Sequence, residues 1–177
     1  MQHLHVIEVF VLAVCAAGAI FDLRSTRIPN ALTFGAAAAA LALRGAMGLE
    51  SFAIALLVMT VVAAAGLFLF SFKLIGGGDV KLIAAIAGAF SFPDVVPFVL
   101  YTMLGGGVLS LAYALSRGSL RQTVQNTYAV AHPLLYRQLP VGMPATTSKM
   151  PYGLAILAGA ALVVLSRTYA PFLSLPI

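Results

Sequence analysis

Two aspartates, Asp22 and Asp79, have the positions best suited to chemistry in this 177-residue chain. Each lies at the end of a long apolar run, in a sequence that is 62% hydrophobic and only 8% charged. Carboxylates are costly at membrane depth and usually functional there. Two facing carboxylates can share one proton, so that one accepts a proton from water while the other polarises a carbonyl. Such a pair would do the acid–base chemistry of an aspartic peptidase.

Each aspartate also has a purely structural interpretation. Asp22 lies in the stretch FDLRSTRIPN, where it could form an ion pair with Arg24 or Arg27. Asp79 follows three glycines in KLIGGGDVKL, and aspartate is favoured at the N-cap position of a helix. Taken singly, these are strong alternatives. The occurrence of both acids at corresponding positions favours the catalytic interpretation.

The residues before Asp79 are Gly76, Gly77 and Gly78. Backbone without side chains lets an extended substrate strand approach closely and lets the segment adopt unusual dihedral angles. A phosphate-binding loop is the rival interpretation, but it requires the spacing G-x-x-x-x-G-K-[ST] after a strand, and neither is present. The glycines are therefore predicted to shape a substrate site.

The elements that position these residues are predicted to be membrane helices. Apolar runs near 20 residues recur along the chain, and they lack the period-two alternation of barrel strands. We expect an all-α, polytopic membrane protein forming a single domain, 1–177. The fourth run is short, about 21 Å as a helix against roughly 30 Å of hydrocarbon, so the glycine segment is expected to dip inward. The six predicted spans are 5–21, 31–49, 51–71, 80–93, 95–116 and 151–169.

Charge predicts the orientation of these spans. If the N-terminus is outside, eight of the ten basic residues fall in inner loops, as the positive-inside rule requires. Both termini are then outside, and both aspartates lie at inner span ends. The loop at 117–150 is either an amphipathic surface helix or a mobile basic loop. The three inner loops are 22–30, 72–80 and 117–150.

The remaining composition limits partners and cofactors. The net charge of +5 is spread over loops, which indicates membrane orientation and a lipid environment, with no nucleic-acid partner. The single cysteine, Cys15, excludes an intrachain disulfide and a cysteine-cluster zinc site. We expect neither a metal nor another cofactor.

Several short motifs resemble one known family. GGGD fits the G-x-G-D signature of membrane-embedded aspartic peptidases. The spacing from Asp22 to Pro29 and Asn30 resembles the first aspartate motif of the type IV prepilin peptidases. VKL after Asp79 and MPYGLAI at 150–156 are also similar to that family.

The resemblance implies a catalytic pair and a substrate. It implies that Asp22 and Asp79 are catalytic and that the basic leader of a prepilin is cut at the cytoplasmic edge of the bacterial inner membrane, after a glycine. The chain lacks the cysteine-paired segment of larger members, so methyltransferase activity is not expected. Its compact form resembles the prepilin peptidases of tight-adherence (Flp-type) pili, and archaeal preflagellin peptidases are similarly compact.

Other residues receive two interpretations each. Lys73 and Lys81 either anchor span ends at the lipid headgroups, or one of them acts in the site. In the site, it would bind an acidic group of the substrate or depress the pKa of Asp79. Pro29 and Asn30 either start the second helix, with Asn30 as its cap, or shape the site. Tyr152 and Gly153 begin the last span on the inner side and could line the cavity. The second triple glycine, 105–107, indicates close helix packing or a kink.

Three rivals to the prepilin peptidase remain at this point. One is another intramembrane GxGD aspartic protease, of the preflagellin or signal-peptide type. A second is a small proton-coupled transporter with Asp22 and Asp79 as a relay, although the spans carry almost no further polar residues. The third is a non-catalytic assembly factor. The oligomeric state and the identity of the pilin are left open.

Overall fold

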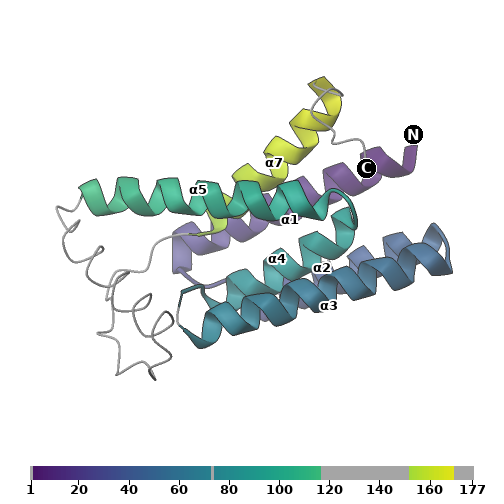
Figure 1. Ribbon diagram of the computed structural model, residues 1–177, viewed down its shortest axis with the longest axis horizontal. Coiled ribbons are helices and arrows are strands. Elements are labelled where there is room, and N and C mark those ends of the chain that lie inside the picture. Colours follow the sequence, from purple (N-terminus) through teal and green to yellow (C-terminus); the bar gives the residue numbers. More distant parts are fainter. Residues whose placement is uncertain (1, 73, 117–151, 170–177) are drawn as a thin grey trace, which may run out of the picture. The chain divides into compact units, whose positions relative to one another are not determined.

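The computed structural model describes residues 2–72, 74–116 and 152–169, and these residues form helices without any strand. The chain divides into two compact units, Met1–Gly106 with Pro151–Ile177 and Gly107–Met150. The first unit holds five whole helices and the beginning of α5, and the described part of the second is the remainder of α5. The helices, labelled in Figure 1, are α1 (Gln2–Ser25), α2 (Asn30–Ala46), α3 (Leu49–Ser71), α4 (Gly77–Phe90), α5 (Val95–Ser116) and α7 (Gly153–Tyr169).

The all-α prediction is confirmed for the described residues. Three stretches are long and apolar enough to cross a membrane, namely His5–Ser25, Leu49–Ser71 and Val95–Ala112. The other helices are shorter, at 17 residues for α2, 14 for α4 and 17 for α7. The part of the chain that the structure describes therefore has three candidate spans, where the sequence predicts six, and the predicted loop 117–150 lies outside that part.

Helix α4 is the most buried element of the first unit. Nine of its 14 residues are buried, and it contacts α1, α2 and α3. Glycines on two neighbours allow this close approach: a Cβ on Gly18 of α1 would be 2.6 Å from Leu82, and one on Gly66 of α3 would be 2.6 Å from Val80. Small residues at helix crossings are typical of membrane bundles, where packing rather than water exclusion holds helices together.

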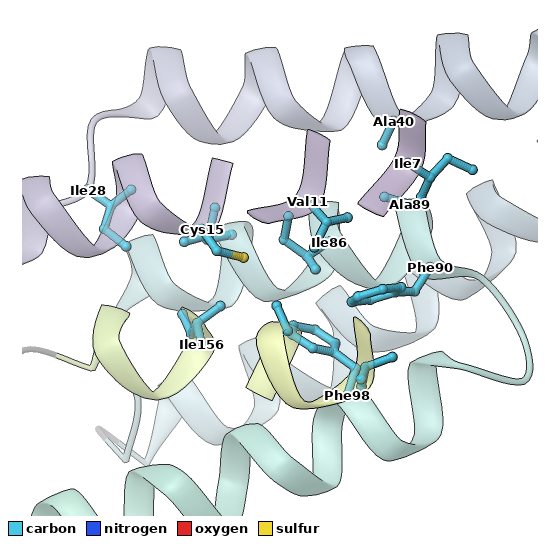
Figure 2. Close-up of a cluster of buried hydrophobic side chains, with 13 residues drawn as sticks. Ile7, Val11, Cys15, Ile28, Ala40, Ile86, Ala89, Phe90, Phe98 and Ile156 are labelled. Carbon is cyan, nitrogen blue, oxygen red and sulfur yellow. The ribbon is translucent and has the colours of Figure 1, made fainter. Parts of the chain in front are cut away.

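A hydrophobic cluster in the first unit contains residues of α1, α2, α4, α5 and α7 (Figure 2). Val11 and Cys15 of α1 lie beside Ile86 of α4, and all three are fully buried. At one end of the cluster, Phe90 and Phe98 contact each other with ring centroids 5.4 Å apart. The cluster includes Ile156 of α7, so it fixes the mutual positions of α1, α4 and α7, the helices on which the site depends.

Charged groups gather at the end of the first unit where α4 finishes. Arg167 of α7 forms ion pairs with Asp94 and with Glu8, the latter at 3.5 Å. Arg44 of α2 donates hydrogen bonds to the carbonyl oxygens of Ala89 and Phe90. The last carbonyls of a helix lack partners within it, so Arg44 satisfies groups that would otherwise be orphaned in an apolar setting.

Candidate active site

Asp22 and Asp79 interact electrostatically although they come from different helices. Asp22 lies in the last turn of α1, which continues to Ser25, and Asp79 lies in the first turn of α4, ahead of the predicted span 80–93. Burial, followed by the negative charge of Asp22, raises the pKa of the Asp79 carboxyl from 3.8 to about 7. The two predicted residues are therefore brought together.

Asp79 is held by the backbone before it. The N-cap of α4 is Gly76, so Asp79 is the third helical residue and the N-cap interpretation from the sequence is wrong. A hydrogen bond from the Gly76 backbone reaches the carboxylate and opposes the rise in its pKa. This is the return half of a capping box, in which an acidic side chain satisfies the N–H of the N-cap residue.

The three glycines before Asp79 are explained by neighbouring side chains that lie close to them, and not by unusual backbone dihedral angles. Gly76 has φ −72° and ψ 145°, angles open to most residues. A Cβ at Gly76 would be 2.6 Å from Asp79 Oδ2, and one at Gly78 would be 3.3 Å from Ile28 Cβ. At Gly77 the nearest atom would be in the Phe70 ring, at 3.4 Å. The expected unusual dihedral angles are not found, and the chain's own side chains lie against all three glycines.

Asp22 accepts a hydrogen bond from the backbone of another helix. It is buried, with 6% of its surface exposed, and its Oδ2 lies 2.7 Å from the N–H of Gly153, the first residue of α7. Among the described residues, no ion pair joins it to Arg24 or Arg27, both of which are exposed. The structural interpretation of Asp22 as half of a juxtamembrane ion pair is therefore not supported.

Tyr152 connects this helix start to α5. Its ring covers Gly106, where a Cβ would be 2.6 Å from Cζ and from the hydroxyl oxygen. Its hydroxyl donates a long hydrogen bond of 3.4 Å to the carbonyl of Thr102, and Asp79 acts on it electrostatically. The prediction of close packing at the second triple glycine is confirmed at Gly106.

Lys81 contacts Asn30 rather than Asp79. Its Nζ donates a 2.8 Å hydrogen bond to Asn30 Oδ1 and lies 5.1 Å from the centroid of the Phe34 ring. Because burial and Asp22 raise the pKa of Asp79, the alternative in which Lys81 depresses it is not supported. Lys73 lies outside the described residues.

Pro29 and Asn30 do start α2, but Asn30 is not its cap. Pro29 occupies the N-cap position in an extended conformation, and Asn30 is the first helical residue. No side-chain hydrogen bond caps this helix, because proline has no side-chain acceptor. The Asn30 amide oxygen instead accepts from Lys81, so the start of α2 is joined to α4 two residues after Asp79.

This arrangement can perform acid–base chemistry on a bound water. One carboxyl has a raised pKa and can carry a proton, and its neighbour receives a backbone N–H. In the described residues, no group of three or more His, Cys, Asp or Glu side chains could hold a metal ion. Sequence reasoning missed Ile28, and it expected close packing at Gly106 without connecting that glycine to Tyr152, because both residues contact the site only through the tertiary fold.

Comparison with known proteins points to one family. The profile of the type IV leader peptidase family matches residues 9–111, more than half of the chain. The match includes both aspartates and the GGGD motif, and it ends before Tyr152. No curated protein and no solved structure gives a significant match. The resemblance inferred from the motifs is therefore confirmed.

Proposed function

The chain belongs to the type IV leader peptidase family and is a membrane peptidase, and from that premise we propose that it is an aspartic endopeptidase acting on prepilins. The observation that carries this proposal is the electrostatic interaction between Asp22 and Asp79 at neighbouring helix ends. Two interacting carboxylates can hold a single proton, as the hydrolysis of a peptide by activated water requires.

The two carboxyl groups take different roles in the proposed reaction. Asp79, with its raised pKa, carries the proton and donates it to the scissile carbonyl oxygen. Asp22, as the carboxylate, accepts a proton from water, and the water oxygen forms a bond to the carbonyl carbon. When the tetrahedral intermediate collapses, the C–N bond breaks, the leaving amine takes the proton from Asp22, and Asp79 takes a proton back from a hydroxyl of the intermediate. The products are a carboxylic acid and an amine, which become carboxylate and ammonium by passing one proton between them, and the pair again holds its single proton.

The proposed substrate is a prepilin of the tight-adherence (Flp) type, cut between its basic leader and its apolar helix. The short connection between α1, which ends at Ser25, and α2, which begins at Asn30, supports this class, because larger family members carry an additional cysteine-paired segment. The site is proposed to face the cytoplasm at the bacterial inner membrane, because the basic loop residues favour that side. With one cysteine in the chain, no methylation of the new N-terminus is proposed.

Processing of a co-expressed Flp-type prepilin tests the proposal. Asp22→Ala and Asp79→Ala should each abolish leader removal while the protein still inserts in the membrane. Glu50→Ala is the matched control, since Glu50 is an exposed acid in the first turn of α3 and should leave cleavage intact. Full processing by either aspartate variant would contradict the two-carboxylate mechanism.

The position of the cut separates the rival peptidases. Mass spectrometry of the product should give a cut after the leader glycine and an unmethylated N-terminus. A cut inside the apolar helix would instead indicate an intramembrane protease of the signal-peptide type, and preference for a preflagellin would indicate the archaeal class. Proton uptake by vesicles without any cleavage would favour the transporter.

A further inference from the structure

The start of α7 contacts Asp22, and it lies outside the part of the chain that matches the family. The first N–H groups of a helix have no partner within the helix, so the Gly153 N–H is available to a side chain. It donates to Asp22 Oδ2 over 2.7 Å. A backbone donor at a fixed helix end sets the direction in which the carboxylate that accepts from it points.

A side chain at Gly153 would crowd this contact. A Cβ on Gly153 would lie 3.0 Å from Ala19 Cα, 3.1 Å from Asp22 Cβ and 3.2 Å from Asp22 Oδ2. The Ala19 atom belongs to the backbone of α1 and cannot turn away as a flexible side chain could. A methyl group would therefore separate the start of α7 from α1 and lengthen the hydrogen bond to Asp22.

Tyr152 fixes the place of this donor. Its ring fills the space over Gly106 of α5, and a Cβ there would be 2.6 Å from two of its atoms. Its hydroxyl reaches the Thr102 carbonyl one turn earlier on the same helix. Because Tyr152 directly precedes Gly153, anchoring the ring on α5 also sets the position of the Gly153 N–H.

We propose that Tyr152 and Gly153 are positioning residues for Asp22: Tyr152, packed on Gly106, fixes the first turn of α7, and the Gly153 N–H holds Asp22 in the orientation of the general base. This inference rests on the proposed function, because it assigns a task to these residues in that reaction. Neither residue needs to touch the substrate for this task.

Two substitutions test the proposal on either side of Tyr152. Gly153→Ala acts at the hydrogen bond itself, and Gly106→Ala displaces the Tyr152 ring from a place remote from Asp22. Each should lower kcat about 10- to 100-fold, the usual cost of losing a hydrogen bond to a charged group, with little change in KM. Gly105→Ala is the matched control, since its Cβ would make an ordinary contact of 3.8 Å with Ala155.

The separate effects on kcat and KM distinguish positioning from general damage. A misplaced base slows only the chemical step, whereas a disrupted site also loses substrate binding and raises KM. Tyr152→Ala takes the ring away from Gly106 and should lower kcat further than Tyr152→Phe, which keeps the ring and loses only the hydroxyl contact with Thr102. Thermal unfolding in detergent identifies a variant that does not fold. If Gly153→Ala does not fold, the result for Gly106→Ala decides the test.

Failure of this inference differs from failure of the proposed function. If Asp22→Ala is inactive but folded Gly153→Ala and Gly106→Ala keep the wild-type kcat, the positioning role is wrong and the peptidase mechanism stands. If Gly105→Ala lowers kcat as much as Gly106→Ala does, the anchoring by Tyr152 is wrong. If Asp22→Ala cleaves normally, the proposed function itself fails.

Discussion

The carboxylate of Asp79 lies directly over Gly76, so close that a Cβ on this glycine would be 2.6 Å from Oδ2. The same glycine supplies a backbone hydrogen bond to that carboxylate. Gly76 thus provides both the backbone N–H that donates to Asp79 and the space that the carboxylate occupies. Another residue would keep the N–H, but its side chain would fill that space. The position of the Asp79 carboxylate therefore explains why the first residue of the GxGD motif is glycine.

Replacing Gly76 by alanine should strongly reduce cleavage without unfolding the protein. The added methyl group must push the Asp79 carboxylate aside, and a displacement of about 1 Å in an active site can cost about 100-fold in rate. Gly77→Ala is the control in the same motif, because its Cβ would make only an ordinary contact of 3.4 Å with the Phe70 ring. Initial rates of prepilin cleavage would measure both, and equal activity in the two variants would contradict this role for Gly76.

Stability should fall as pH rises towards neutrality because of Asp79. Its pKa is raised in the folded protein from 3.8 to about 7, so in this range the folded state keeps a proton that the unfolded chain has released. The free energy of unfolding therefore decreases with rising pH through that window. Asp79→Asn lacks this contribution and should be more stable than wild type above pH 7, with the difference vanishing near pH 4, as measured by thermal unfolding in detergent.

Asp22→Asn provides the second arm of this experiment. Removing the Asp22 charge removes the second cause of the raised Asp79 pKa, so this pKa should fall. The pH range over which the free energy of unfolding decreases should then end at a lower pH. Cleavage by the wild type should also decline above about pH 7, where Asp79 loses the proton it donates. A stability curve unchanged by Asp22→Asn would mean that the two carboxylates do not interact.

The proximity of Asp22 and Asp79 could be predicted because a membrane protein's sequence indicates its topology. The apolar runs predict the spans, and the basic residues predict which span ends face inward, so two acids at inner ends are expected on the same side of the membrane. The helix limits were less accurate. Asp22 was expected to follow a helix, yet α1 continues to Ser25. The end of an apolar run shows where the apolar surface of a helix ends, whereas the helix itself continues as long as its backbone hydrogen bonds do.

The support around the aspartates could not be predicted in the same way. The hydrogen bond from Gly153 to Asp22 joins positions 131 residues apart, and its donor is a backbone group that every residue type except proline carries. Likewise, the space left by the missing side chain of Gly106 can be interpreted only when the structure shows the Tyr152 ring packed there. The sequence marks small residues as places of close approach, but it does not say which element approaches.

Lys81 should have little effect on the ionisation of Asp79. Its ammonium donates to Asn30 and lies near the Phe34 ring, on an exposed surface. Lys81→Met should therefore cost less than about 1 kcal/mol of stability and leave the alkaline limb of the cleavage profile in place. Were Lys81 holding the pKa of Asp79 down, that limb would move to higher pH in the variant.

Arg44 should contribute more to stability than Lys81. Its Nε and Nη2 donate to the Ala89 carbonyl over 2.9 and 2.7 Å, and Nη2 also reaches the Phe90 carbonyl. Arg44→Met leaves these carbonyls of α4 without their donor, which should cost about 1–3 kcal/mol. Arg44→Lys keeps the charge but not the planar fork, and an intermediate melting temperature is expected. A melting temperature equal to wild type in Arg44→Met would contradict this capping role.

The proposed orientation of the site can be read from cysteine labelling. Ser25 and Glu50 are exposed, and they lie at opposite ends of the predicted topology, Ser25 three residues after Asp22 and Glu50 in the first turn of α3. The native Cys15 is fully buried and should stay silent to an impermeant thiol reagent. Glu50→Cys should be labelled in intact cells, whereas Ser25→Cys should be labelled only in inverted vesicles. The opposite pattern would place both aspartates on the outer side, where a leader that never crosses the membrane could not reach them.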